Sequence, residues 1–229
     1  MLLSESPAPG LAALSSPQDV RAREITRSVS DHYDRLAQPY TEAFFEDVSD
    51  SPWLDRLLVR LPLGARVLDA GCGPGRLARY MAGQGCAVTG IDLSSKMIDA
   101  AKRLVPEATF RVMDMSQLHF GAESFDGVFA AYSLFHVPPE RLDQTLGEFR
   151  RVLVTGGFAA FIVKRGMGER LVPSPLVPGE TCYLQLWDPA EFATRLVSCG
   201  FQVVEHLTAA PDSAEELPFE RLFFLAQRA

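Results

Sequence analysis

Three features that would assign this chain to common classes of protein are missing from its sequence. The four cysteines form neither a C-x-x-C pair nor a zinc-knuckle spacing, which favours free thiols in a reducing compartment. Acidic residues outnumber basic ones by 29 to 22, which disfavours a nucleic-acid-binding surface. No apolar run approaches the roughly 18 residues of a membrane span, and the first residues lack the basic and apolar regions of a secretion signal. We therefore expect a cytoplasmic protein with neither nucleic acid nor a membrane as partner, and no pattern predicts an oligomeric state.

The composition that remains is that of an ordinary globular protein. The chain has 229 residues, of which 47% are hydrophobic and 22% are charged. This length fits one α/β domain with a modest addition. Residues 1–16 mix Ser, Pro, Gly and Ala and predict a flexible tail. Residues 17–62 predict a helical lid, which precedes the main domain at 63–229.

Two helices are expected in the lid. The first begins at Pro17, which a first helical turn tolerates, and ends at about Ala37, before Pro39. The second runs from about Pro52 to Arg60 and carries leucines at helical spacing.

From residue 66 onward, candidate strands and helices alternate. Strands are expected at 66–69, 87–91, 109–113, 125–131 and 157–164. The helices between them are expected at 76–84, 95–104 and 139–153. This rhythm predicts a parallel sheet with helices on both faces.

The alternation stops after Arg165. Residues 166–182 hold many glycines and prolines, and a loop of that length is expected to act as a lid or a binding segment. A helix at about 188–199 and a closing strand pair at 201–207 and 222–228 complete the expected elements.

The most informative segment is residues 67–75, which read Val-Leu-Asp-Ala-Gly-Cys-Gly-Pro-Gly. A strand that breaks into a glycine loop lets backbone amides approach a ligand closely. Asp69, ahead of the loop, would repel a pyrophosphate but suits a cation, unlike a dinucleotide-binding loop. A nicotinamide dehydrogenase would also need G-x-G-x-x-G, whereas the third glycine here stands at the alternate position.

Two further carboxylates end the next two expected strands. Asp92 follows the first glycine by about 20 residues, a spacing at which an acidic residue accepts both hydroxyls of a ribose. Asp114 can accept from an exocyclic amine, and Met115 beside it offers an apolar contact to a ring. The three carboxylates therefore share the edge of the sheet at which ligands bind.

Asp-x-Gly-x-Gly-x-Gly after a strand, followed by these two acids, resembles the class I S-adenosylmethionine (SAM)-dependent methyltransferases of small-molecule type. The resemblance is strongest over about residues 30–165. It implies a doubly wound, mostly parallel seven-stranded sheet of Rossmann-like type, an N-terminal helical lid and an antiparallel C-terminal strand. It also implies SAM as the cofactor and S-adenosylhomocysteine as its product.

In this family the glycine loop holds the methionine part of SAM, with the first acid near the ammonium group. The second acid holds the ribose and the third holds the adenine amine. Carried over residue by residue, the resemblance implies a cofactor site made of Tyr33, Asp69, Ala70, Gly71, Cys72, Gly73, Gly75, Asp92, Leu93, Met97, Asp114, Met115, Ala131 and Tyr132.

His136 is the candidate catalytic residue. It follows the fourth expected strand, where the methyl group should point, and imidazole titrates near neutral pH. Two interpretations stay open for His136: it acts as a general base, or it is a hydrogen-bonded residue of the pocket wall. Tyr33 and Tyr40 belong to a Tyr-Asp-x-x-Ala-x-x-Tyr segment that resembles a lid over the cofactor. For them the interpretations are a bond to the SAM carboxylate, closure of the acceptor pocket, or helix packing.

The predicted acceptor is an apolar or aromatic small molecule, methylated on O, N or C, with natural-product biosynthesis as one setting. Its wall is expected from residues 20–45 and 166–187, with Phe44, Phe45, Met167, Leu171, Tyr183, Leu186 and Trp187 as apolar members. Ala131 stands where a metal-dependent catechol methyltransferase needs a carboxylate, so no metal is expected. Two alternatives stay open: a methyltransferase for a peptide or protein carboxyl group, and a non-catalytic SAM-binding protein.

Overall fold

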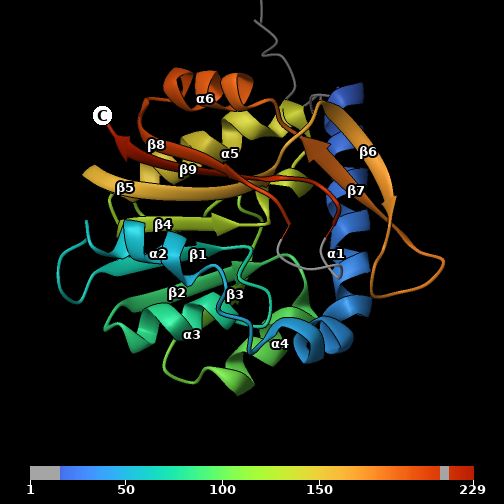
Figure 1. Ribbon diagram of the computed structural model, residues 1–229, viewed down its shortest axis with the longest axis horizontal. Helices are drawn as coiled ribbons and strands as arrows, with labels where there is room; N and C mark the ends of the chain where they lie inside the picture. Colours follow the sequence, from blue (N-terminus) through green and yellow to red (C-terminus); the bar gives the residue numbers. More distant parts are fainter. Residues whose placement is uncertain (1–15, 212–216) are drawn as a thin grey trace, which may run out of the picture.

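A seven-stranded sheet forms the middle layer of the fold in the computed structural model, which describes residues 16–211 and 217–229 (Figure 1). The expected tail at 1–16 therefore lies almost wholly outside the described residues. The strands of the sheet are β1 (Arg66–Ala70), β2 (Ala87–Asp92), β3 (Thr109–Val112), β4 (Phe125–Ala131), β5 (Leu153–Lys164), β8 (Phe201–Ala209) and β9 (Arg221–Arg228).

The strand order is β3-β2-β1-β4-β5-β9-β8, and β9 is antiparallel to both of its neighbours. β1, β2, β3, β4 and β5 pair in parallel. The predicted doubly wound, mostly parallel seven-stranded sheet with an antiparallel C-terminal strand is confirmed. Its order reverses between β1 and β4, and ligands bind at such a switch point in open α/β sheets.

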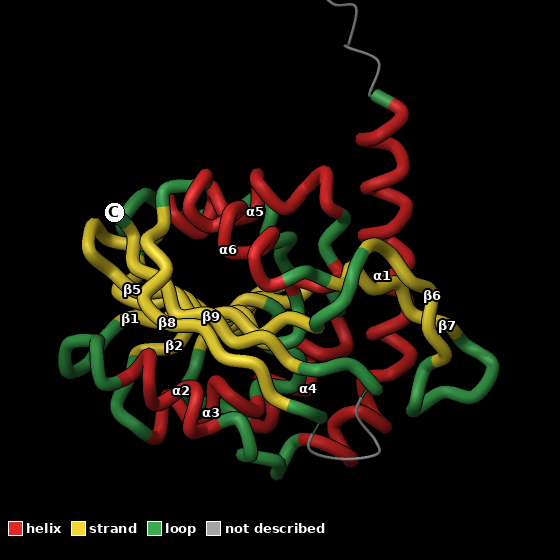
Figure 2. Tube along the Cα trace, turned by 45° about the horizontal axis from the view of Figure 1, so that its top comes forward, coloured by secondary structure: helices red, strands yellow, loops and turns green. Residues whose placement is uncertain are grey.

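Helices cover both faces of this sheet, as Figures 1 and 2 show. On one face lie α5 (Pro139–Val152) and α6 (Pro189–Ser198), and on the other lie α2 (Ser51–Leu58), α3 (Arg76–Gly83) and α4 (Ser95–Leu104). Each face has its own hydrophobic core, and β4 contributes to both. Its Val128 packs into one core and its Phe129 into the other, because successive side chains of a strand point to opposite faces. This explains the apolar run of β4 in the sequence.

The long helix α1 (Pro17–Phe44) stands at the end of the sheet to which the parallel strands point (Figure 1). Ser16 caps it by accepting a hydrogen bond from the backbone N–H of Asp19. The prediction that α1 ends before Pro39 is wrong, because the helix continues through this proline. A proline inside a helix costs about 3 kcal/mol. Leu36 and Ala37 offset this cost by packing around Met97 of α4, which holds the helix in place.

A separate two-stranded hairpin, β6 (Gly168–Pro173) and β7 (Thr181–Leu186), packs beside α1 (Figure 1). The prediction of a continuous loop over residues 166–182 is therefore wrong. The sequence hid the hairpin because β6 is mostly exposed and is bounded by glycine and proline. Residues of the buried strand β7, by contrast, pack against residues that follow β4.

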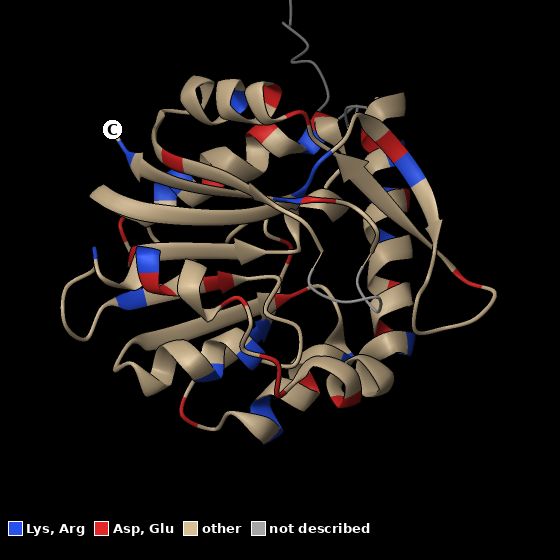
Figure 3. Cartoon of the chain, in the orientation of Figure 1, with Lys and Arg blue, Asp and Glu red and all other residues tan. Residues whose placement is uncertain are grey.

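Acidic and basic residues both occur along α1 and β6, where Figure 3 shows both colours. Two acids, Glu169 in β6 and Glu180 in the connection between β6 and β7, join the hairpin to the helix. Glu169 pairs with Arg21, and Glu180 accepts two hydrogen bonds from Arg35, at 2.6 and 3.0 Å. Among the helices of the described part of the chain, none is long and apolar enough to cross a membrane. All four cysteines are free thiols.

Candidate active site

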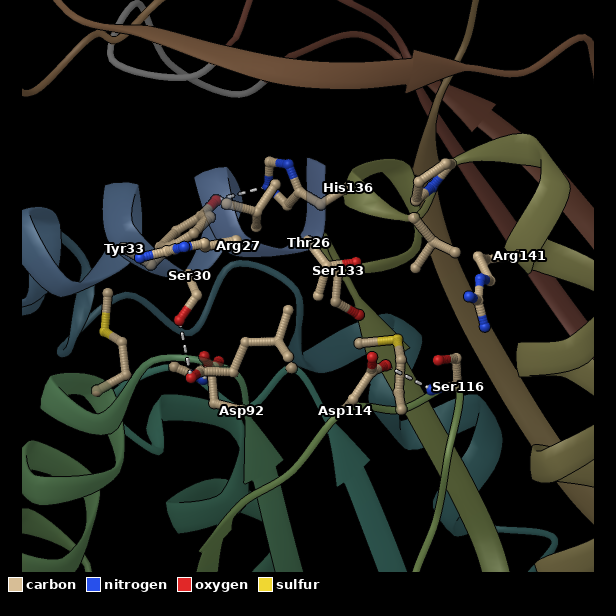
Figure 4. A pocket seen from close by; sticks show the side chains of 18 of the residues that line it. Thr26, Arg27, Ser30, Tyr33, Asp92, Asp114, Ser116, Ser133, His136 and Arg141 are labelled. Atoms are coloured by element: carbon tan, nitrogen blue, oxygen red, sulfur yellow. Dashed lines mark hydrogen bonds between the residues drawn. The ribbon is translucent and has the colours of Figure 1, made fainter. Parts of the chain in front are cut away.

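A cavity of about 380 Å³, the first cavity, opens at the carboxyl ends of the parallel strands and is bounded on its other side by α1 (Figure 4). The structure brings together in its wall most of the predicted site residues. These are Tyr33, Gly71, Gly73, Asp92, Leu93, Met97, Asp114, Met115, Ala131, Tyr132 and His136. They come from α1, the glycine loop, and the residues at or after β2, β3 and β4, so the fold alone assembles the site.

The glycine loop forms part of the wall of this cavity because it packs directly on the segment after β4. Gly71 has a φ of +81°, and a Cβ atom there would lie only 2.2 Å from Cβ of Ser133. The hydroxyl of Ser133 also donates to the carbonyl of Ala70 at 2.7 Å. No other residue type fits this position without moving one of the two segments.

Two of the predicted carboxylates face the cavity, with Ser30 and Tyr33 of α1 on the opposite wall (Figure 4). Asp92 accepts from the backbone N–H of Gly73 at 2.9 Å and from that of Ser94 at 2.8 Å. Burial raises the pKa of Asp92, and these backbone donors oppose the rise. Asp114 accepts from the N–H of Ser116 at 2.8 Å. Both carboxylates are thus held in fixed orientations at the strand ends.

The other predicted residues, Asp69 and Ala70 at the end of β1 and Cys72 and Gly75 in the loop, do not line the cavity. Asp69 is only 3% exposed, and its Oδ2 atom has no hydrogen-bond partner among the described residues. Burial raises the pKa of this carboxyl to about 7, against the opposing charge of Arg76. An unpartnered buried carboxylate oxygen is costly, and it fits a cationic group held over the loop.

A second cavity of about 350 Å³ adjoins the first and shares Tyr33, Tyr40, Tyr132 and His136 with it. Most of its wall is apolar and includes Leu36, Phe44, Phe135 and Leu176. Sequence reasoning missed its polar end, where Arg76 pairs with the buried Asp50 at 2.9 Å and the hydroxyl of Tyr132 donates to Asp50 at 2.8 Å. Only the position of Arg76, directly after the glycine loop, could have signalled this cluster.

Both segments predicted for the acceptor wall, 20–45 and 166–187, line the second cavity, but the apolar members named for them mostly do not. Of these seven members, only Phe44 lines the second cavity. Met167 and Leu171 lie on the outer hairpin and are 75% and 72% exposed. Trp187 is buried in one of the two main cores, because it follows a strand that packs inward. Phe45, Tyr183 and Leu186 are also buried and line neither cavity.

His136, in the short helix η1 (Leu134–His136), is hydrogen-bonded through both ring nitrogens. Nδ1 lies 2.8 Å from the backbone carbonyl of Tyr183, and Nε2 lies 2.7 Å from the hydroxyl of Tyr33 (Figure 4). Burial lowers the pKa of His136 to about 4. The imidazole is therefore neutral at physiological pH, and it stands where the two cavities meet.

Comparison with known proteins decides the family. A model of the methyltransferase domain matches residues 67–157. The ubiquinone biosynthesis O-methyltransferase of Paracidovorax citrulli is 34% identical over 170 residues, which are 67% of this chain and 69% of that protein. The chain belongs to the class I SAM-dependent methyltransferases. The cofactor of this family, SAM, carries hydrogen-bond donors on its ammonium group, ribose and adenine amine, and the first cavity presents carboxylate acceptors, Asp92 and Asp114.

Two further comparisons show how far the similarity to known methyltransferases extends. The 1,6-didemethyltoxoflavin-N1-methyltransferase of Burkholderia thailandensis, solved with its substrate and S-adenosylhomocysteine, shares the fold with a TM-score of 0.73. That alignment is 23% identical and covers 97% of this chain and 94% of the other. The malonyl-acyl-carrier-protein O-methyltransferase of Enterobacter lignolyticus is 37% identical over 109 residues, 47% of this chain. The chain spans only 43 to 60% of the length of this and two other curated relatives.

Proposed function

We propose that this protein transfers the methyl group of SAM to a small molecule seated in the second cavity. One observation carries the proposal: two cavities, one lined by the glycine loop and the strand-end carboxylates, meet at Tyr33, Tyr40, Tyr132 and His136. A methyl donor and an acceptor need such a junction, because the reacting atoms must be aligned at short range. SAM, when bound, supplies an electrophilic methyl group.

The residues of the first cavity have distinct roles in this proposal. Asp92 accepts from the ribose hydroxyls, and Asp114 accepts from the adenine amine. Gly71 and Gly73 leave room for the methionine part, and Asp69 offsets its ammonium charge from the end of β1. Leu93, Met97 and Met115 give apolar contacts. The remaining predicted residues, Ala70, Cys72, Gly75, Ala131 and Tyr132, shape the loop and the wall.

The N-terminal lid, residues 17–62, excludes water from both cavities in this proposal. The hydroxyl of Ser94 donates to Asp34 of α1 at 2.6 Å, and the hydroxyl of Ser30 donates to the carbonyl of Leu93 at 3.1 Å. Water exclusion strengthens the electrostatic contacts within the site.

A small acceptor is favoured over a peptide because α1 and the β6–β7 connection confine the second cavity. Glu180 of that connection accepts from Arg35 and lies 3.0 Å from Nδ1 of His32, a residue that lines the cavity. The relative from Paracidovorax citrulli is named for ubiquinone biosynthesis, and the toxoflavin enzyme is named for a small molecule.

Two measurements test the proposed function. Calorimetry should give micromolar dissociation constants for SAM and for S-adenosylhomocysteine. With methyl-labelled SAM and a cell extract, the label should appear in the low-molecular-weight fraction. Absence of binding contradicts the proposal, and label confined to the protein fraction favours the peptide or protein methyltransferase instead.

The raised pKa of Asp69 predicts that the affinity of the protein for S-adenosylhomocysteine depends on pH. Between about pH 5 and 7 the free protein holds a proton on Asp69, and binding of an ammonium group releases that proton. The ammonium group itself stays charged below about pH 7.7. Affinity for S-adenosylhomocysteine should therefore fall on acidification from about pH 7 to 5.5, by up to about tenfold per pH unit. Calorimetry at each pH measures this slope.

The matched variant is Asp69→Asn, which has nothing to titrate. It should bind more weakly at neutral pH and show a flatter pH dependence. If the affinity of the wild-type protein for S-adenosylhomocysteine stays constant from about pH 7 to 5.5, Asp69 does not interact with the ammonium group.

A further inference from the structure

The contact between Tyr33 and His136 fixes where a proton can go at the junction of the two cavities. The carbonyl of Tyr183 can only accept, so its 2.8 Å contact places the imidazole proton on Nδ1. The lone pair on Nε2 then accepts from the hydroxyl of Tyr33 at 2.7 Å. Tyr33 thus donates toward His136, and its own oxygen lone pairs remain able to accept a hydrogen bond from a ligand.

The surroundings of His136 keep it neutral. From α1 the ring of Tyr33 contacts the imidazole at a centroid distance of 5.1 Å, and the charge of His32 acts on it. From β7 it faces the carbonyl of Tyr183 and the Sγ atom of Cys182, which lies 3.7 Å from Nδ1. Phe135, which follows β4, lies beside the imidazole at a centroid distance of 4.5 Å, and Tyr132 packs against Phe135. No carboxylate of the described residues hydrogen-bonds to this imidazole. Asp92 does not contact Tyr33 or His136 through a hydrogen bond, but its negative charge contributes to raising the pKa of Tyr33.

We infer that Tyr33 and His136 together receive the proton of a ring hydroxyl, so that the acceptor is a phenol or enol methylated on oxygen. This inference rests on the proposed function and names its acceptor class. A neutral amine needs no base to attack a methyl group, and a carboxylic acid is already ionised at neutral pH. A phenolic hydroxyl, with a pKa near 10, keeps its proton at neutral pH and must lose it.

The step balances in atoms and charge. An oxygen lone pair of the acceptor forms the O–CH₃ bond, and the electrons of the S–CH₃ bond return to sulfur. The acceptor proton passes to the oxygen of Tyr33 while the hydroxyl proton of Tyr33 passes to Nε2 of His136. One positive charge is present before, on sulfur, and one after, on the imidazole. The buried site therefore keeps its net charge, which limits the cost of forming an imidazolium there.

The apolar wall of the second cavity suits a ring compound, and its volume of about 350 Å³ falls within the range of small-ligand pockets. The probes are accordingly mono- and dihydroxynaphthalenes, with aminonaphthalenes as matched acceptors that carry no acidic hydroxyl. Each is incubated with SAM, and the methylated product is identified by mass spectrometry. At saturating SAM, wild-type protein should methylate a hydroxynaphthalene on oxygen, at a rate that is flat from about pH 6 to 9 because His136 is already neutral.

His136→Gln and Tyr33→Phe should each lower this rate at pH 7 by about 100-fold, within the range of general-base effects. Their residual rate should rise with pH, up to about tenfold per unit, because hydroxide or prior ionisation must then remove the proton. His206→Gln, on the exposed face of β8, and Tyr80→Phe, whose hydroxyl donates to Asp55, are the matched controls with unchanged rates.

A readout independent of turnover is the ¹⁵N NMR spectrum of the imidazole in the S-adenosylhomocysteine complex. The spectrum should show an Nδ1–H tautomer that stays neutral to pH 5, and the Nε2 signal should shift in Tyr33→Phe. An Nε2–H tautomer contradicts the inference. So does SAM binding without methylation of any hydroxynaphthalene, or a rate indifferent to His136→Gln. In those cases the proposed function stands, whereas loss of SAM binding by the wild-type protein defeats both.

Discussion

Gly71→Ala should unfold at a lower urea concentration than the wild-type protein and should bind SAM far more weakly. An alanine at φ +81° is strained by about 1–2 kcal/mol. Its Cβ would stand 2.2 Å from Cβ of Ser133, and relief of that overlap adds about 1–3 kcal/mol. Because the glycine loop and the Ser133 segment both line the first cavity, separating them also deforms the ligand site.

Gly83→Ala is the matched control, since a Cβ there has nothing within 4 Å and the residue lies in α3. It should leave SAM affinity unchanged and raise stability by up to about 1 kcal/mol. Adding Ser133→Gly to Gly71→Ala removes the overlapping atom, and this double variant should recover part of the lost stability. Urea unfolding with calorimetry measures all four proteins. Wild-type stability and affinity in Gly71→Ala would mean that the two segments separate freely.

Asp92→Ala should weaken SAM binding by about 100-fold. A charged acceptor that serves two hydroxyl donors contributes about 1.5–3 kcal/mol per hydrogen bond, and 2.8 kcal/mol corresponds to about two powers of ten. The substitution also removes the bonds to the N–H groups of Gly73 and Ser94, so the loop loses an anchor as well. Calorimetric titration with SAM measures the change.

Asp126→Ala separates these two effects. Asp126 also lies on a strand and accepts a backbone N–H, that of Arg66 at 2.8 Å, but it does not line the first cavity. The Asp126→Ala variant should be less stable than the wild-type protein but should bind SAM with little change in affinity. Equal SAM affinities in Asp92→Ala and Asp126→Ala would mean that Asp92 does not bind the ribose.

The sequence was sufficient for the sheet and for most of the first cavity because both follow from local patterns. Alternating strands and helices determine a parallel sheet, and residues at strand ends then meet at one edge. Asp92 and Asp114 were found in this way. Asp69 was expected at the same edge but does not line the cavity. The reason is that β1 continues for one more residue, Ala70, before the glycine loop begins.

Two segments of the second cavity, 20–45 and 166–187, were predicted from the sequence, but its side-chain contacts were not, because they join distant segments. Asp50 meets Arg76 and Tyr132, and Tyr33 meets His136 across 103 positions. Periodicity describes neighbours within one helix or strand and carries no information on such pairs. The hairpin of β6 and β7 was missed for a related reason: its position depends on α1, not on the main sheet.

In the proposed reaction, the four side chains common to both cavities make the two ligands thermodynamically dependent on each other. A molecule that orders Tyr33, Tyr40, Tyr132 or His136 from one side prepares or distorts the surface met by the other. Linkage then requires reciprocity: the factor by which SAM alters acceptor affinity equals the factor by which the acceptor alters SAM affinity. Product release is subject to the same coupling, since demethylation of the donor and methylation of the acceptor change both surfaces in a single turnover.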